Sequence, residues 1–203
     1  MSPLTKDVVK FGAFVVTSQV FHLTPLSFAL VNLKPLLPGH VLVSPRRSVP
    51  RFHDLSPAEV QDLFLTVQRV SRMVERVFDA SALNIAIQDG VDAGQSVPHV
   101  HAHIIPRRRE DLAHAGGTDA VYRMMEGEQG DLGAQLRGRA AEAEAGAGAG
   151  GVPSNNDGQQ SRARFPAVDA DESRKPRGEQ EMQKEAEWLA AEMAGDEQSG
   201  RNT

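Results

Sequence analysis

The sequence has no cysteine among its 203 residues. This absence excludes a disulfide framework, a metal site built from thiolates and a cysteine nucleophile. It does not identify a cellular compartment. Any covalent catalysis must therefore use another nucleophile.

Long apolar runs are also missing. A helix that spans a bilayer needs about eighteen or more consecutive apolar residues, and no such run occurs. The opening residues, Met1 to Asp7, lack the apolar stretch of a secretory signal. We therefore expect a soluble protein without membrane association, located in the cytoplasm and with the nucleus as a second compartment.

An excess of positive charge is absent as well, because the formal net charge is −5 at pH 7. Non-specific binding to nucleic acid requires a basic surface that neutralises phosphates. We expect no nucleic-acid partner. Any phosphate chemistry must be local.

The apolar residues are unevenly distributed along the chain. Branched and aromatic side chains are dense from Phe11 to Arg107, whereas 127–178 is rich in Ala, Gly, Glu, Gln and Pro. Such a composition cannot bury enough apolar surface to fold, so it predicts a disordered insertion. We divide the chain into a folded domain (1–126), the insertion (127–178) and a C-terminal helix with a tail (179–203). The helix is predicted from the apolar stripe Met182, Ala186, Leu189 and Met193.

The folded domain alternates short β-prone segments with one strong helix signal. Ser56, Pro57 and Glu59 provide an N-cap, a proline at the first helical position and a capping box, so they predict a helix that ends near Phe78. These elements favour an α+β fold with an antiparallel sheet of about five strands and this long helix on one face. The predicted strands are Phe11–Val16, Ser27–Asn32, His40–Pro45, Leu83–Gln88 and Val97–Pro106.

Three histidines alternate along the last predicted strand. Because side chains in a strand alternate between faces, His99, His101 and His103 share one face, and Val100, Ala102 and Ile104 share the other. A row of imidazoles facing the core would bury unpaired polar nitrogens, so the row points to chemistry.

Zinc is the alternative use for such a row. Histidines spaced by two can bind zinc if other ligands complete the site, and Asp89, Asp92 and His40 are candidates. No second paired cluster occurs, and we predict no metal bound by the protein itself. A serine nucleophile elbow and a Gly-x-x-x-x-Gly-Lys loop are also missing.

The segment His99-Val100-His101-Ala102-His103-Ile104-Ile105 resembles the His-φ-His-φ-His-φ-φ motif of the histidine triad (HIT) superfamily. Further segments resemble the fragile histidine triad branch, the diadenosine triphosphate hydrolases. The resemblance implies a HIT-like fold and a homodimer. These further segments are Leu30-Val31-Asn32, Pro38-Gly39-His40-Val41-Leu42-Val43, Arg51-Phe52-His53-Asp54-Leu55, Gln88-Asp89-Gly90 and Ala93-Gly94-Gln95-Ser96-Val97.

The resemblance implies that His101 is the catalytic nucleophile. A bare imidazole nitrogen would attack the α-phosphorus of a dinucleoside polyphosphate, and water would then hydrolyse the nucleotidyl-histidine. Diadenosine triphosphate would yield AMP and ADP. A neighbouring acceptor must hold the other ring nitrogen as a donor, and we expect a backbone carbonyl. A divalent cation, Mg²⁺ or Mn²⁺, is expected to bind with the substrate phosphates.

The resemblance also implies a set of substrate-binding residues. His99 and His103 would meet the phosphate oxygens, His40 would line the pocket, and Asn32 would contact the ribose. Polyphosphate donors would come from Gln88, Gly94, Gln95, Ser96 and Val97. Phe14 departs from the family, since members often carry a histidine there.

Several functions remain open at this point. The chain could be a nucleoside phosphoramidate hydrolase of the broader superfamily, although the Gln95-Ser96-Val97 loop favours the triphosphate hydrolases. Nucleotidyl transferases of the superfamily usually have glutamine at the third triad position, so His103 argues against that branch. A different class of function is a nucleotide-sensing module with slow turnover, whose output is the substrate-bound complex.

Overall fold

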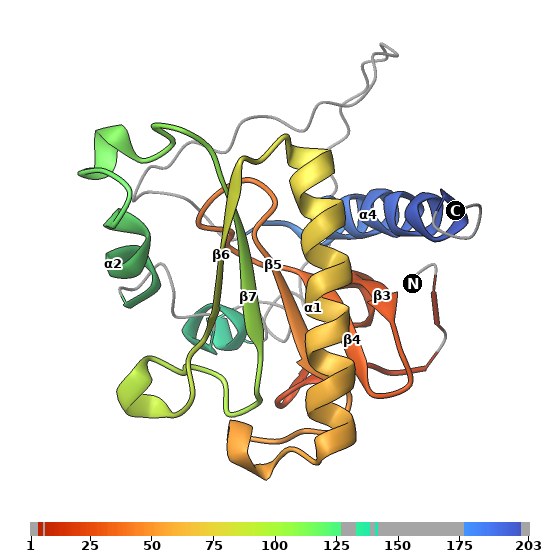
Figure 1. Ribbon diagram of the computed structural model, residues 1–203. Coiled ribbons are helices and arrows are strands. Elements are labelled where there is room, and N and C mark those ends of the chain that lie inside the picture. Colours follow the sequence, from red (N-terminus) through yellow and green to blue (C-terminus); the bar gives the residue numbers. More distant parts are fainter. Residues whose placement is uncertain (1–3, 6, 127–132, 139–140, 142–176, 200–203) are drawn as a thin grey trace, which may run out of the picture.

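The computed structural model describes residues 4–5, 7–126, 133–138, 141 and 177–199 (Figure 1). Its centre is a five-stranded antiparallel sheet with the order β3-β4-β5-β7-β6. The strands are β3 (Val20–Leu23), β4 (Ser27–Val31), β5 (Val41–Pro45), β6 (Ala82–Ile87) and β7 (Ala102–Arg107). This architecture confirms the predicted α+β class and the number of strands.

The first predicted strand is wrong. Phe11–Val16 is not one strand, because the chain reverses at Gly12, which has a φ of +57°. The result is a small separate hairpin of β1 (Lys10–Phe11) and β2 (Phe14–Val15), with Phe11 opposite Phe14. The sheet instead begins with β3, which the sequence patterns did not reveal.

Helix α1 (Pro57–Phe78) lies across the sheet, as Figure 1 shows, and contacts β4, β5 and β7. Its start agrees with the prediction, since the Ser56 hydroxyl accepts from Glu59 N–H and the Glu59 carboxylate accepts from Ser56 N–H. The apolar face of α1, which includes Leu63, Val67, Val70 and Val74, is largely buried, but Phe64 is 46% exposed. Phe64 therefore lies at the border of this apolar face, where it packs edge-on against Phe52.

Helix α4 (Glu179–Ser199) packs against β3 and α1, beside the edge of the sheet. The four residues of its predicted stripe are buried, and Trp188 packs edge-on against Phe78 at 5.6 Å between ring centroids. Two ion pairs link the helices, because Arg76 of α1 contacts Glu192 at 2.7 Å and Asp196 at 2.8 Å. The predicted apolar stripe of the C-terminal helix therefore faces the main core.

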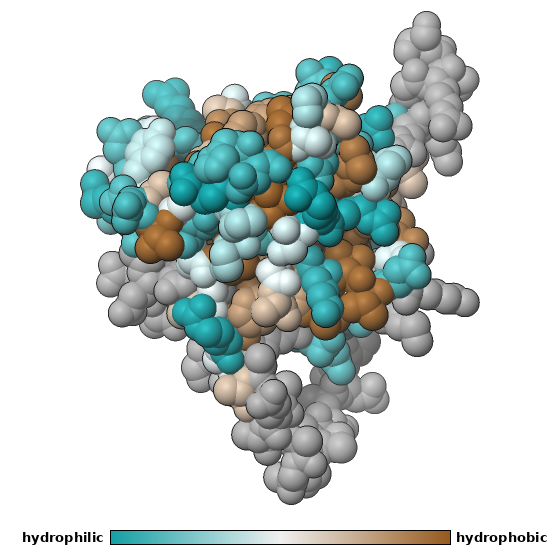
Figure 2. All heavy atoms as spheres, turned by 90° about the horizontal axis from the view of Figure 1, so that it is seen from below, coloured by the Kyte–Doolittle hydropathy of each residue, from teal (hydrophilic) through white to brown (hydrophobic). Residues whose placement is uncertain are grey.

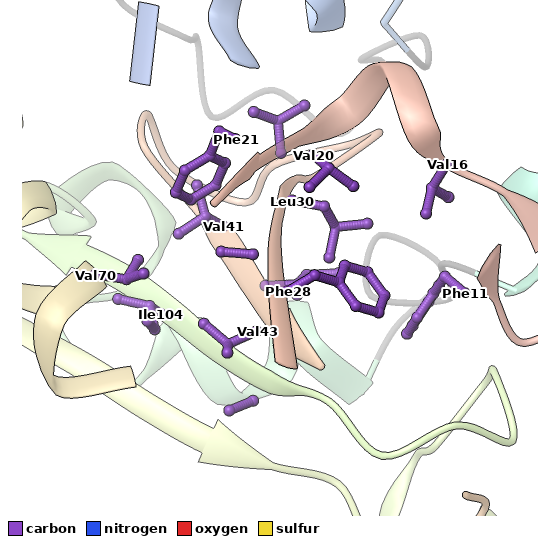
Figure 3. Packing of buried hydrophobic residues seen from close by; sticks show 14 of the residues in the cluster. Phe11, Val16, Val20, Phe21, Phe28, Leu30, Val41, Val43, Val70 and Ile104 are labelled. Carbon is purple, nitrogen blue, oxygen red and sulfur yellow. The ribbon is translucent and has the colours of Figure 1, made fainter. Parts of the chain in front are cut away.

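The main core fills the space between α1, α4 and the sheet. Figure 3 shows Val70 of α1 beside Ile104 of β7, and Phe28 of β4 near Phe11 of the small hairpin. A second apolar cluster joins Ile105 and Leu112 to Val121 of α2 (Ala120–Glu126). Short 3-10 helices occupy Phe52–Asp54, Val91–Ala93, Ala113–Ala115 and Thr17–Gln19.

Hydrophilic and hydrophobic side chains are interspersed on the face that Figure 2 views from below. Isolated apolar residues on a surface are ordinary and need no partner to explain them. Among the described residues, no helix has the length and apolar character needed to cross a membrane.

The predicted insertion, 127–178, lies mostly outside the described residues. Residues 133–138 are an exception, because they form a helix and bury Leu136 (5% exposed) in the main core. The structure thus places 133–138 in a helix and not in a disordered segment. The average composition of a long segment does not reveal a single apolar side chain that packs into the core.

Candidate active site

The histidine segment enters the sheet later than predicted. Strand β7 starts at Ala102, not Val97, because the preceding backbone bonds to other partners. Val100 N–H donates to Val49 O (2.7 Å), and Val100 O accepts from the Ser44 hydroxyl (2.7 Å). The alternation itself is confirmed, since Val100, Ala102 and Ile104 all belong to the main core.

His101 has the arrangement of a nucleophile. Its Nδ1–H donates to the carbonyl oxygen of His99 at 2.7 Å, which leaves Nε2 without a proton. A backbone carbonyl was the expected acceptor. The ring is 1% exposed, and this burial lowers the pKa of His101 from 6.5 to about 4. The imidazole is therefore neutral near pH 7.

His99 cannot contact phosphate through its ring in this arrangement. Its Nδ1 accepts from Gly12 N–H (2.9 Å), so Nε2 carries the proton and donates to Pro45 O (2.8 Å). Both ring nitrogens are engaged, which contradicts the predicted phosphate contact. The carbonyl of His99 instead orients His101.

His103 presents a donor because of a relay from the β4–β5 loop. Leu36 N–H donates to Nδ1 of His40 (3.1 Å), so Nε2 of His40 carries a proton. That Nε2–H donates to Nδ1 of His103 (3.0 Å), which places the remaining proton of His103 on Nε2. His103 Nε2 is buried and has no hydrogen-bond partner within the described part of the chain. The His101 and His103 rings lie 4.9 Å apart, so this donor lies beside the nucleophile.

The small β1–β2 hairpin completes the histidine cluster. Phe11 stacks on His99 at 5.5 Å and meets His101 edge-on at 5.1 Å between ring centroids. Gly12 supplies the donor to His99, and a side chain at that position would collide with Val97. Sequence reasoning missed both roles. The glycine after Phe11 was the available signal, since a positive φ favours glycine.

Gln88 and Gly94 lie close together in the loop that follows β6 (88–97), the predicted substrate loop. Gly94 has a φ of +86°, and a Cβ there would lie 2.5 Å from Gln88 Nε2. The glycine therefore allows the half-buried Gln88 amide to approach the loop backbone. Asp89 fixes the neighbouring turn by accepting from Phe52 N–H at 2.8 Å.

The side chains of Gln95 and Val97 have structural roles. Gln95 is 8% exposed, and its amide accepts from Gly90 N–H (3.0 Å) and donates to Pro50 O (2.8 Å). Val97 is buried in the main core. The Gln95 amide still has a second N–H, so the substrate contact of Gln95 stays a prediction.

Ser96 contacts a segment far along the chain. Its hydroxyl accepts from Gly133 N–H at 3.1 Å, at the start of helix 133–138. A Cβ on Gly133 would lie 2.2 Å from Ser96 O, so the two backbones are in close contact. The predicted phosphate-binding loop is thus packed against residues of the predicted insertion.

Asn32 lies just beyond β4 and is 4% exposed. Its Oδ1 accepts from Lys34 N–H at 3.1 Å, while its Nδ2 lies 3.4 Å from Nε2 of His40. Asn32 is therefore beside the histidine relay. Phe14, the departure from the family, is partly buried against the main core.

Metal-binding geometry is absent from the described ranges, where no group of three or more histidine, aspartate or glutamate side chains converges on one point. The candidate zinc ligands Asp89 and His40 are engaged by Arg51 and by His103.

Comparison with known proteins places this geometry in a family. The HIT domain model matches residues 13–110. The bis(5'-nucleosyl)-tetraphosphatase [asymmetrical] of Schizosaccharomyces pombe is 49% identical over 180 residues, which cover 88% of this chain and 91% of the relative. The bifunctional bis(5'-adenosyl)-triphosphatase/adenylylsulfatase FHIT of Arabidopsis thaliana is 49% identical over 127 residues, which cover 62% of this chain and 69% of the relative.

A solved structure agrees with these matches. The crystal structure of Plasmodium falciparum diadenosine triphosphate hydrolase in complex with cyclomarin A is 31% identical, with a TM-score of 0.52. The match covers 68% of this chain and 90% of that chain. The chain therefore belongs to the HIT domain family and, within it, to the fragile histidine triad branch.

Proposed function

We propose that the chain hydrolyses dinucleoside polyphosphates, and diadenosine triphosphate to AMP and ADP in particular. The observation that carries the proposal is the state of His101, whose Nδ1–H is held by the His99 carbonyl while Nε2 is bare. A neutral imidazole in a fixed tautomer is prepared for nucleophilic attack. The adjacent Nε2–H of His103 is a donor without a protein partner among the described residues.

The reaction balances in two displacements. Nε2 of His101 forms a bond to the α-phosphorus as the bridging P–O bond breaks, and ADP leaves with the bond's electron pair. Water then attacks the same phosphorus, the P–N bond breaks, and AMP leaves while His101 returns to its neutral form. The proton from water is released to the products or to the solvent.

His103 and the substrate loop would stabilise the charge that develops. A buried donor aimed at a phosphate oxygen is worth more than the same donor in water, because no solvent competes for the site. The half-buried Gln88 amide and the backbone at Gly94 would bind the remaining phosphates. Mg²⁺ or Mn²⁺ carried by the polyphosphate would supply charge neutralisation to the departing diphosphate.

The names of the relatives support the substrate class and differ in phosphate number. One is a triphosphatase and another, which matches more of the chain, is a tetraphosphatase. Assays should therefore compare diadenosine triphosphate with diadenosine tetraphosphate under the same conditions.

His101→Asn is expected to abolish turnover of both substrates and to leave AMP binding largely intact. Asparagine retains a polar group of similar reach but cannot form the nucleotidyl-histidine. Product formation is measured by chromatography and AMP affinity by calorimetry. His114→Asn, at an exposed position, is the matched control and should keep the parent rate. Undiminished turnover in His101→Asn would exclude it as the nucleophile.

A homodimer and a cytoplasmic location, with the nucleus as a second compartment, belong to the same proposal. Strand β6 ends the sheet and pairs only with β7 among the described strands. Ile85 on this edge strand is 49% exposed. An unpaired edge with an apolar side chain favours pairing with another chain. The location rests on the sequence alone.

A further inference from the structure

The start of the β4–β5 loop is held by a residue from the other end of the described chain. Arg177 N–H donates to Leu33 O at 3.0 Å, and the Arg177 guanidinium donates to Asn32 O. The same guanidinium contacts Glu185 of α4 at 2.5 Å. Arg177 thus connects α4 to Asn32 and Leu33 at the start of the β4–β5 loop.

The Arg177–Glu185 pair is buried, with side-chain exposures of 11% and 7%. Removing charges from water is costly, and burial indeed raises the pKa of Glu185. Replacing a buried ion pair by apolar residues is often neutral or stabilising, so stability alone does not account for this pair. Four buried apolar residues already dock α4 without it.

We propose that Arg177, held by Glu185, is a positioning residue that orients Asn32 for substrate. Asn32 is the residue through which Arg177 acts, and its side chain lies 3.4 Å from His40 in the relay to His103. The loop that begins at Asn32 also supplies Leu36 N–H to that relay. This inference rests on the proposed function, because it assigns Asn32 to the nucleotide.

The chain offers a matched control for this proposal. Arg76 also links α4 to the body of the protein, through Glu192 and Asp196, but it lies on α1 and these contacts do not involve the β4–β5 loop. A general loosening of α4 should follow from losing either arginine. An effect on substrate should follow only from losing Arg177.

The experiment measures KM and kcat for diadenosine triphosphate in Arg177→Met, in Arg177→Met with Glu185→Leu, and in Arg76→Met. Loss of a charged hydrogen bond that orients a binding group should raise KM by about tenfold. The expected result is this rise in both Arg177 variants, with kcat nearly unchanged and the parent KM retained in Arg76→Met. The paired variant removes the buried charge along with its partner, so it is the one expected to keep parental stability.

The Asn32→Ala background decides whether Arg177 acts through Asn32. Residues in one network have non-additive effects, so Arg177→Met should add little to the KM of Asn32→Ala. Full additivity, an unchanged KM in the Arg177 variants, or an equal rise in Arg76→Met would each overturn the proposal. If the parent chain hydrolyses neither polyphosphate, the proposed function fails. The AMP affinity of the same variants, measured by calorimetry, then decides on Arg177 by the same criteria.

Discussion

At the scale of single residues, the three histidines of the motif differ in which ring nitrogen carries the proton and in what that nitrogen contacts. Both ring nitrogens of His99 are hydrogen-bonded, to Gly12 N–H and to Pro45 O. The Nδ1–H of His101 donates to a backbone carbonyl. His103 accepts a hydrogen bond from His40 Nε2–H at Nδ1 and carries its own proton on Nε2, where it can act as a donor. The partners of each ring therefore assign the structural histidine, the nucleophile and the donor.

The activity is expected to persist at a lower pH than a catalytic histidine with an unshifted pKa would allow. Only the neutral form of His101 can attack, and burial lowers the pKa of His101 from 6.5 to about 4. At pH 6 about 99% of a group with that pKa is neutral, against about 24% for an unshifted histidine. The acid limb of kcat/KM, which reports the free enzyme, should therefore have its midpoint near pH 4.

Folding must be followed over the same range. An unfolded chain protonates His101 near pH 6.5, so folding stability falls as pH drops from there toward 4. Circular dichroism at each pH separates loss of fold from protonation of the nucleophile. A midpoint near 6.5 in a fully folded protein would contradict the burial of His101.

At the scale of elements, α1 depends on its cap. Glu59 accepts from Ser56 N–H, and both of its oxygens accept from Arg47 at 2.7 Å, which holds the pKa of Glu59 at about 2. The Ser56 hydroxyl closes the box by accepting from Glu59 N–H. The Ser56 hydroxyl is not among the hydrogen-bond partners of the His99, His101 and His103 rings, so its loss should affect stability more than chemistry.

Ser56→Ala is expected to lower the free energy of unfolding by about 1 kcal/mol, the usual effect of losing an N-cap. Urea denaturation followed by circular dichroism measures the change, and kcat should stay at the parent value. Ser48→Ala, at an exposed site before the helix, is the control. Equal losses in the two variants would argue against a capping role.

Helix 133–138 changes how the predicted insertion should be manipulated. Leu136 is buried in the main core and Gly133 binds Ser96 of the substrate loop. A deletion of 127–178 as one block would remove these contacts and Arg177 together. A test of the low-complexity residues should therefore spare 133–138 and 177–178.

At the scale of the whole molecule, the edge of the sheet predicts the oligomer. The parent chain is expected to sediment at twice the mass of one chain, and Ile85→Glu at the mass of one. A charge on a paired edge strand opposes its partner across the interface. Leu65→Glu, at a 57% exposed position on α1, is the control and should remain dimeric. Analytical ultracentrifugation decides, and a parent that sediments as a single chain would contradict the dimer.

Elements whose signals are local could be predicted from the residues alone. The Ser56 cap, the alternation around His101 and the Met182 stripe each rest on residues a few positions apart, and the structure agrees with all three. The spacing and the resemblance also identified the family, since the histidine motif is contiguous. Local steric and hydrogen-bond rules are enough for such features.

The contacts made in the folded chain determine which polar atoms remain available to bind a substrate. Gln95 and His99 read as substrate contacts in the sequence, yet the distant backbone groups Pro50 O and Pro45 O accept hydrogen bonds from them. Arg177 became relevant because folding brings it to Asn32, 145 positions away. A hydrogen bond depends on distance and angle in space, and spacing along the chain does not specify these for residues far apart.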